Sequence, residues 1–535
     1  MFAASAAFVF WRQTQVGVLV DISYILNTAS RIAGGDMPYS AFRLAHPPLT
    51  FLMQALLIRV FGPYYVFPML YTSIASGAAT VLAYQIARRL LRDVVSRPDV
   101  LAAVLCVPLV TIGIYAIFPH PHYDPDSALA TLAALAAVFF ARERPTPRRW
   151  MIAGALLVVP LFVKQNIGGA FLPPVLGVLA LDAIAHRSRV RDVLWCLAGV
   201  AVALATAVGL IQLLAGLNSY VTWTITYAMA ERGVLLDRYV HFADTRSIAV
   251  GLLMPVVAIA LPRVPPRLRM GTVVAVIVLP LTVIVAITTP LIWVPLLVSA
   301  AALALVGVAR GRVTFETLLP FICAGTLAGT LQSNGLGASS FGTFPLLIVM
   351  VASLVRELHH WTSRANPQIA PVFAMLLAGI LFASGTVYTL SNDRLAFIDL
   401  APNAPIARST VPNLWGLSAR GRYIGELDET LAWISRHVAP GEPATFLPGE
   451  DPVYYALGMK PGLPAVQFID GSNAYTPEEL ARVADQTGLR WVFVKDRRQL
   501  RSPDDLPQGP VIVDLLTRNA DLVDVLGPYR VYRRR

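Results

Sequence analysis

The chain has 535 residues, of which 56% are hydrophobic and only 14% charged, with a formal net charge of +11 and a mean hydropathy of +0.62. Soluble domains carry about 25% charged residues, so the composition excludes the roughly three or four soluble domains that length alone would suggest. The positive charge does not indicate nucleic-acid binding, because most arginines fall in short loops between apolar runs long enough to cross a bilayer.

The chain opens with "MFAASAAFVF", which is too short to span a membrane and lacks the basic flank of a signal peptide. Extending this run to Val20 would bury Arg12 and Gln13. We therefore expect the sequence as given to begin inside a first span, with Trp11 onward already outside.

The next stretch, "VDISYILNTASRIAGGDMPY", predicts a helix that lies on the membrane. Asp21 follows an apolar approach, and the apolar residues from Ile22 to Ala33 then recur with helical spacing. Gly34 and Gly35 end this helix, and "HPPL" opens a second one. The expected external surface helices cover about residues 22–60.

Arginine-rich loops alternate with loops nearly free of Lys and Arg along the apolar part of the chain. This alternation is the positive-inside pattern and places the arginine loops in the cytoplasm. The external loops are then expected at about 119–126, 216–245 and 332–342. The predicted spans, about 12–13 with the N-terminal one, are 66–87, 99–118, 127–141, 150–163, 168–185, 192–215, 247–262, 271–287, 291–309, 317–331, 343–355 and 369–389.

Charge becomes regular after residue 390. The runs "ATFLP", "AVQFI" and "WVFVK" resemble strands, and "TPEELARVADQTG" predicts a helix with Thr476 as N-cap, Glu479 closing a capping box and Gly488 as the stop. "GED" at 449–451 is interpreted as a strand-to-helix turn. We therefore predict an α-helical polytopic membrane domain over 1–390 and a small soluble extracytoplasmic α/β domain over 391–535.

The three cysteines, Cys106, Cys196 and Cys323, all lie in apolar runs without metal-binding spacing. This placement argues against a disulfide framework and a structural zinc site.

Several polar and charged residues are predicted to share the external face. Asp21 opens the first surface helix, and "PHPHYDPDSA" at 119–128 adds His120, His122, Tyr123, Asp124 and Asp126. "VKQN" at 163–166 ends a short span with Lys164 and Gln165, and the aromatic loop 218–244 contributes Glu231, Arg232, Asp237 and Arg238.

The order of these parts resembles the GT-C superfamily of polytopic glycosyltransferases, and more closely the bacterial relatives of dolichyl-phosphate-mannose protein mannosyltransferases. The matching pieces are Asp21, "GDMPY" at 35–39, "HPPL" at 46–49, "DPD" at 124–126 and Lys164. The motifs cover residues 20–170, and the later spans and the tail agree in layout. Many relatives have Glu or Arg beside the first Asp and Lys before the double proline, where this chain has Ile22 and His46.

The resemblance implies an enzyme that moves a sugar from a polyprenyl-phosphate donor to an extracytoplasmic hydroxyl of a lipid, glycan or protein. Asp21 is expected to be the catalytic base, because a carboxylate can accept the proton of the attacking hydroxyl. Inversion at the anomeric carbon follows if no second carboxylate acts as nucleophile. The residues expected to bind the donor phosphate or sugar are Lys164, His46, Asp124, Asp126, Tyr123, His122, Gln165, Arg232 and Arg238.

Most of these assignments have a structural alternative that the sequence leaves open. Asp21, Asp124 and Asp126 could cap helices, and Lys164 could extend its charge to the membrane surface. His120 and His122 could be solvated, His46 a turn residue, and Arg232 and Arg238 partners in loop salt bridges.

No cofactor is certain from the sequence. A divalent metal stays open, with Asp124, Asp126 and His122 as its candidate ligands. The expected partners are the polyprenyl-phosphate sugar, a cell-envelope acceptor and the bilayer, with no nucleic acid, in the plasma (inner) membrane. The rival functions are a secondary transporter of a lipid or glycan precursor and a non-catalytic membrane scaffold. The sequence does not identify the sugar or the acceptor.

Overall fold

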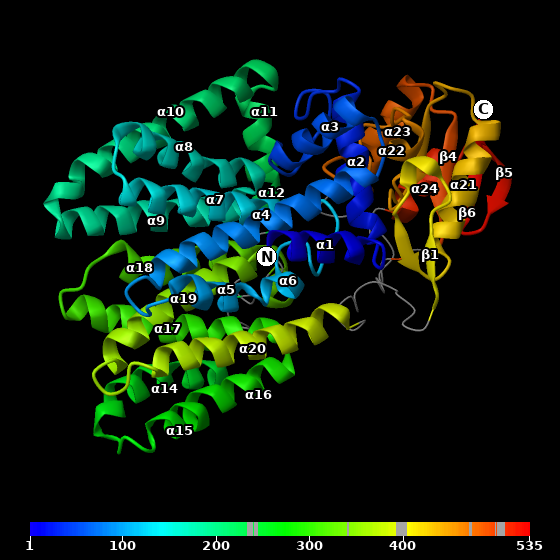
Figure 1. Cartoon of the computed structure of the whole chain (residues 1–535). Coiled ribbons are helices and arrows are strands. Elements are labelled where there is room, and N and C mark those ends of the chain that lie inside the picture. Colours follow the sequence, from blue (N-terminus) through cyan, green and yellow to red (C-terminus); the bar gives the residue numbers. More distant parts are fainter. Residues whose placement is uncertain are drawn as a thin grey trace.

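The structure is a computed structural model of the chain (Figure 1). It describes residues 1–232, 239, 244–339, 342–391, 404–469, 473–497, 499 and 509–535, without the side chains of 231, 232, 334–339, 509 and 510. Arg238 and the Asp237 beside it therefore lie outside the described residues.

Long apolar helices run side by side through the N-terminal three quarters of the chain (Figure 1). Among the described residues, eight helical segments are long and apolar enough to cross a membrane. The helices of this part are α1 (Phe2–Gln13), α2 (Leu19–Ala33), α3 (Leu49–Phe61), α4 (Val66–Leu90), α5 (Pro98–Cys106), α6 (Leu109–Ile112), α7 (Tyr123–Glu143), α8 (Pro147–Val163), α9 (Gln165–Ala185), η1 (Arg187–Arg189), α10 (Val190–Leu214), α11 (Leu217–Val221), η2 (Thr222–Tyr227), α12 (Ala228–Arg232), α14 (Thr245–Ala260), η3 (Leu261–Arg263), α15 (Arg269–Val273), η4 (Val274–Val278), α16 (Leu279–Ile287), η5 (Thr289–Ile292), α17 (Trp293–Ala309), α18 (Phe315–Ser339), α19 (Phe344–Thr362) and α20 (Ile369–Leu390).

Each predicted span contains helix, but the predicted spans 99–118, 150–163, 317–331 and 343–355 are not among the eight long apolar segments found in the described residues, and one of them is not continuous. The predicted span 99–118 consists of two short helices, α5 and α6, since Pro108 interrupts the run and Gly113 ends it in extended backbone. The first segment also differs from expectation. Arg12 and Gln13 belong to α1 and are buried, with the Arg12 guanidinium donating to the Thr389 carbonyl at 2.7 Å.

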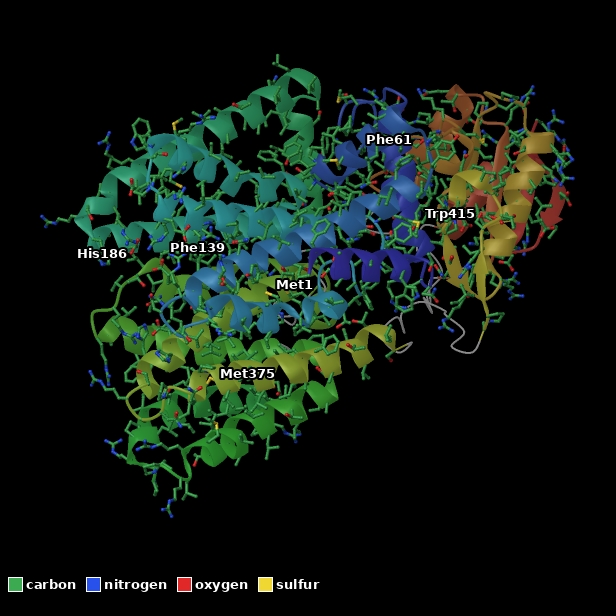
Figure 2. The ribbon with its side chains drawn as sticks, viewed as in Figure 1. Met1, Phe61, Phe139, His186, Met375 and Trp415 are labelled. Carbon is green, nitrogen blue, oxygen red and sulfur yellow. The ribbon has the colours of Figure 1, made fainter. Side chains whose placement is uncertain are left out.

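The arginine loops lie together at one end of the helices. Arg89 and Arg92 both pair with Glu143, at 3.0 and 2.9 Å, which joins the loop after α4 to the end of α7. Arg142 in turn bonds to Asp182 of α9 and Glu316 of α18. Figure 2 shows His186 at this end and Trp415 of the C-terminal region at the opposite end. The alternation inferred from the sequence is thus present in the packing.

The two predicted surface helices exist, but they differ in exposure. α3 exposes an apolar face that includes Leu56, Val60 and Phe61, as expected of a helix facing lipid. α2 is instead covered: Ser23 and Asn27 on its polar side are buried beneath the C-terminal region. The predicted helix is present as α2, but its polar side bonds to protein rather than water.

The C-terminal region combines strands with helices. Its elements are β1 (Ile406–Arg408), η8 (Pro412–Leu414), β2 (Ser418–Arg420), α21 (Tyr423–His437), β3 (Ala444–Leu447), α22 (Val453–Leu457), α23 (Pro477–Gln486), β4 (Trp491–Lys495), α24 (Gly509–Thr517), β5 (Ala520–Leu526) and β6 (Tyr529–Arg534). The main sheet has the order β3-β4-β6-β5, with β3 parallel to β4 and the other pairs antiparallel. β1 pairs separately with β2.

Two of the three predicted strands are confirmed, as β3 and β4, and so is the capping box of α23. The strand predicted at "AVQFI" is wrong. This segment makes a bond from the Phe468 amide to the Pro448 carbonyl at 2.9 Å, and it passes over the turn at Gly449. The C-terminal hairpin β5–β6 was not expected.

One apolar core joins the two parts of the chain. Leu19, Ile22 and Leu26 of α2 belong to the same buried cluster as Leu417 and Tyr455 of the C-terminal region. The C-terminal region is therefore packed directly onto α2, at the end of the bundle away from the arginine loops (Figure 1).

Candidate functional site

The predicted base, Asp21, lies in the first turn of α2. Its side chain keeps 34% of its surface exposed, although most of α2 is buried. Asp21 Oδ2 lies 3.4 Å from His120 Nε2. Burial tends to raise the pKa of Asp21, but the interactions with His120 and His122 outweigh it and leave the pKa below its ordinary value. Asp21 is thus an ionised, accessible carboxylate at neutral pH.

His120 is buried beside Asp21, whereas the sequence left open that it is a solvated loop residue. Its side chain is only 1% exposed, so it is not a solvated loop residue. Among the described residues, neither ring nitrogen has a hydrogen-bond partner of normal geometry. Burial lowers the pKa of His120, although the nearby Asp21 raises it in part. A neutral imidazole therefore faces the carboxylate of Asp21.

The second part of the site is the start of α7. His122 is the N-cap residue of α7, and its Nδ1 lies 3.3 Å from Asp124 Oδ2. Asp124 in turn contacts the ammonium group of Lys164, and this ammonium lies 4.9 Å from the centre of the Tyr123 ring. The charge of Asp124 also reaches Asp21, whose ionisation it opposes. The rings of His120 and His122 lie 6.1 Å apart between centres, so these two histidines connect Asp21 to the Asp124–Lys164 pair.

Lys164 owes its place to a break between two helices. It ends α8 and precedes α9 with an extended backbone, φ −150° and ψ 112°. α8 has 17 residues, which gives about 25 Å of helix against a hydrocarbon core of about 30 Å. The side chain is 3% exposed. Lys164 is therefore a buried ion-paired lysine at the site and does not reach into solvent as a snorkelling side chain would.

His46 joins the site through aromatic contacts. Its ring stacks on Tyr123 with 4.3 Å between ring centres, and its Nδ1 lies 2.9 Å from the Tyr24 hydroxyl. The Tyr39 hydroxyl donates to the His46 carbonyl at 2.7 Å. Tyr39 has a left-handed backbone, φ 69°, which is uncommon for a tyrosine. This constrained turn fixes His46 against the start of α7.

Asp126 has a different role from Asp124. It accepts hydrogen bonds from Thr50 and Tyr71, both at 2.7 Å, and from Tyr115. These hydroxyls come from α3, α4 and the segment after α6, so Asp126 ties α7 to its neighbours. Among the described residues, no group of three or more His, Cys, Asp or Glu could hold a metal ion. His122, Asp124 and Asp126 do not form the metal site left open by the sequence.

The remaining predicted residues are placed as follows. Gln165 donates to the Thr224 carbonyl at 2.9 Å and so holds the segment around η2. Arg232 ends α12, but its side chain is not among those described. The donor-binding assignments of Arg232 and Arg238 therefore stay predictions.

Two glutamines of the C-terminal region contact the start of α2 beside Asp21. The sequence did not indicate these contacts. Gln467 donates to the Val20 carbonyl at 3.2 Å, and Gln499 bonds to Leu19 at 2.8 Å. Both contacts flank Asp21 in the chain. No local motif signals such contacts, because they join residues more than 400 positions apart.

Crystal structures of ArnT from Cupriavidus metallidurans are among the solved structures that this chain resembles. The structure bound to undecaprenyl phosphate shares 12% identity at a TM-score of 0.46, and the apo structure 13% at 0.43. Each alignment covers 99% of this chain and 97% of the other. A likeness this loose decides neither the fold nor the site. No curated protein sequence matches the chain.

A family model gives a more definite result. Residues 45–211 match the model described as dolichyl-phosphate-mannose-protein mannosyltransferase. This range holds His46, Asp124 and Lys164 but begins after Asp21. Over residues 45–211 the chain is similar to the dolichyl-phosphate-mannose-protein mannosyltransferases, which confirms the GT-C resemblance seen in its sequence.

Proposed function

We propose that this protein is a membrane glycosyltransferase that moves a sugar from a polyprenyl-phosphate donor to an extracytoplasmic hydroxyl. The observation that carries the proposal is the cluster at the end of the bundle opposite the arginine loops, where His120 and His122 connect Asp21 to the Lys164–Asp124 pair. The match to a family named for a lipid-phosphate sugar supports the same chemistry.

Asp21 supplies the base in this proposal. The acceptor hydroxyl attacks the anomeric carbon, its proton passes to the Asp21 carboxylate, and the bond from that carbon to the phosphate oxygen breaks. General-base catalysis of this kind contributes about 10²–10⁴-fold. The low pKa of Asp21 keeps the carboxylate ready to accept a proton at neutral pH.

Lys164 supplies positive charge for the departing phosphate. Charge grows on the phosphate as the bond breaks, and a fixed cation in a poorly solvated site stabilises it. Asp124 holds the ammonium in place, and the stack of His46 on Tyr123 closes the site beside it. A phosphate bound here shares Lys164 with Asp124, which makes Asp124 a positioning group for the lysine.

The stereochemical outcome follows from the number of free carboxylates. Asp124 is engaged by Lys164 and His122, and Asp126 by three hydroxyls. Asp21 is the most exposed of these three carboxylates, since its side chain is 34% exposed against 14% for Asp124, and Asp126 is buried. Because it serves as the base in this proposal, we propose direct displacement with inversion at the anomeric carbon.

The direct test is transfer by the purified protein in lipid nanodiscs. A panel of polyprenyl-phosphate sugars is offered with cell-envelope acceptors, and the product is followed by mass spectrometry and its anomeric configuration by NMR. We expect transfer with inversion for the wild type and for Asp36→Asn, a matched carboxylate just after α2. Failure of the wild type with every donor in the panel would contradict the proposal, and a retained configuration would contradict direct displacement.

A further inference from the structure

The first turn of α2 lacks a cap of its own. Its N-cap residue, Val18, has no side chain that can accept a hydrogen bond. The first N–H groups of a helix have no partner within the helix. Here Leu19 N–H donates to Gln499 Oε1 at 2.8 Å, and Gln499 Nε2 donates to the Gly17 carbonyl at 2.8 Å. One side-chain amide thus bonds the backbone on both sides of Val18.

Gln499 is itself fixed by a buried group of charges. Its own N–H donates to Glu450 Oε1 at 2.7 Å. Lys495 Nζ lies 2.8 Å from both Glu450 Oε2 and Asp451 Oδ2, and Tyr529 donates to Asp451. The side chains of Lys495, Glu450 and Asp451 are all at most 2% exposed. Buried pairs of this kind are costly to break, so they make a firm anchor.

The segment that holds Glu450 and Asp451 also contacts α2 on the C-terminal side of Asp21. Ser23 Oγ donates to the Gly449 carbonyl at 2.6 Å, and Asn27 Nδ2 to the Asp451 carbonyl at 3.1 Å. The segment before α2 also lies close to β2 at Gly17, where an added Cβ would lie 2.5 Å from the Ser418 carbonyl oxygen. Asp21 is therefore bracketed by contacts at residues 19 and 23.

We infer that Gln499 is a positioning residue, which caps α2 from the far end of the chain and thereby fixes the carboxylate of Asp21. The inference rests on the proposed function for the role of Asp21, while the cap itself stands on geometry. A shift of about 1 Å in a reacting group can cost about 10²-fold in rate. The C-terminal region is then a structural part of the active site.

The test uses Gln499→Met in the full-length protein, because methionine keeps the volume and removes both hydrogen bonds. Hydrogen exchange of the amides at 19–22 should speed up by about five- to tenfold, the effect of losing a typical helix cap. In the transfer assay kcat should fall by about 10–100-fold, while KM for the donor changes by less than about threefold.

Glu479→Gln is the matched control. Glu479 forms a two-bond contact with Arg43, at 2.7 and 2.9 Å, and so also joins the C-terminal region to the membrane part. Gln keeps the hydrogen bond to the Thr476 amide and weakens the contact with Arg43. We expect normal exchange at 19–22 and normal kcat. An equal loss of kcat in this variant would show that loosened docking, and not the cap, is responsible.

Gly17→Ala disturbs the cap from the membrane side if Gln499→Met folds poorly, because the Gly17 carbonyl accepts a hydrogen bond from Gln499 Nε2. Its new Cβ must displace the Ser418 carbonyl, and exchange and kcat should change as in Gln499→Met. Unchanged exchange at 19–22 in both variants would overturn the inference, as would faster exchange with unchanged kcat or a loss confined to KM. A wild type without transfer would overturn the proposed function instead, and the exchange measurement would still decide whether Gln499 fixes the turn.

Discussion

At the scale of single residues, a substitution of Asp21 can distinguish a catalytic role of this carboxylate from a helix-capping role. Asn caps a helix about as well as Asp but cannot accept the hydroxyl proton. We expect Asp21→Asn to lower transfer by about 10²–10⁴-fold with little change in melting temperature. Turnover of the purified variant with a lipid-phosphate sugar is the measurement. Near-normal turnover would remove Asp21 from the mechanism, and Asp36→Asn controls for the loss of a carboxylate on this side.

Transfer activity should depend on the charge of the side chain at position 164 more than on its shape. Lys164→Ala removes the cation and leaves Asp124 buried without its lysine, whereas Lys164→Arg keeps the charge with a different geometry. We expect Ala to raise KM for the donor and lower kcat, each by about tenfold or more, and Arg to retain more activity. Lys460→Ala, at an exposed salt bridge with Asp36, is the control. Equal, near-normal transfer by both Lys164 variants would show a structural lysine.

His120 should make stability depend on pH. Burial holds its pKa below the ordinary value of 6.5, so the unfolded chain binds a proton more readily than the folded one. The stabilisation is complete above pH 6.5 and is lost as the pH falls through the lower folded value. We expect the melting temperature of the wild type to drop between pH 7 and pH 5 more than that of His120→Gln. Parallel curves would contradict this, and His186→Gln at the other end of the bundle is the control.

The sequence predicted the residues of the site better than their pairings. Asp21, Asp124, His46 and Lys164 stand out because carboxylates, histidine and lysine are rare next to apolar runs. The partner of each residue depends on tertiary contacts: Asp126 accepts from three hydroxyls, and His120 is buried beside Asp21. A prediction from neighbouring residues cannot contain such contacts, so the three hydroxyl partners of Asp126 could not be foreseen.

At the scale of elements, α8 and α10 meet through glycines. A Cβ at Gly199 would lie 2.1 Å from the Met151 carbonyl oxygen, and one at Gly154 would lie 2.0 Å from that of Cys196. Small residues let membrane helices approach this closely. We expect Gly199→Val to lower the melting temperature by several degrees and to reduce transfer, because α8 ends at Lys164.

Gly209 on the same helix provides the control for that substitution. No heavy atom lies within 4 Å of a Cβ added there. Gly209→Ala should be neutral or slightly stabilising, since alanine is favoured over glycine inside a helix by roughly 0.5–1 kcal/mol. Equal melting temperatures for Gly199→Val and the wild type, measured in the same detergent, would show that the two helices separate without cost.

Helices were predicted well and strands less well, for a physical reason. A membrane span is signalled by its own length and hydropathy, and the helix α23 by its own cap and stop residues. A strand depends on a partner: "AVQFI" has strand composition but bonds to a turn, whereas β5 and β6, with exposed Leu522 and Val525, form a hairpin. α2 was predicted correctly as a helix, but its covering by distant residues was not.

At the scale of the whole molecule, the position of the arginine loops predicts the side of the membrane on which the site lies. These loops gather at one end and the C-terminal region at the other (Figure 2), and arginine loops face the cytoplasm. We expect a cysteine introduced at Lys460, which is exposed, to react with a membrane-impermeant maleimide in intact spheroplasts. A cysteine at Arg148, which is exposed in the first turn of α8, should react after permeabilisation. The reverse pattern would contradict both the topology and the extracytoplasmic site.

The hydrogen bond between Leu19 and Gln499 can form only late in biosynthesis. Its partners are 480 residues apart, and ribosomes add about 5–20 residues per second. The first turn of α2 therefore waits roughly 25 to 95 s for the residue that caps it, while the intervening helices insert. A nascent or truncated chain that stops before residue 499 has its helices in the bilayer but its carboxylate unfixed. If Asp21 is the base, we expect the protein to become active only when nearly the whole chain has been translated.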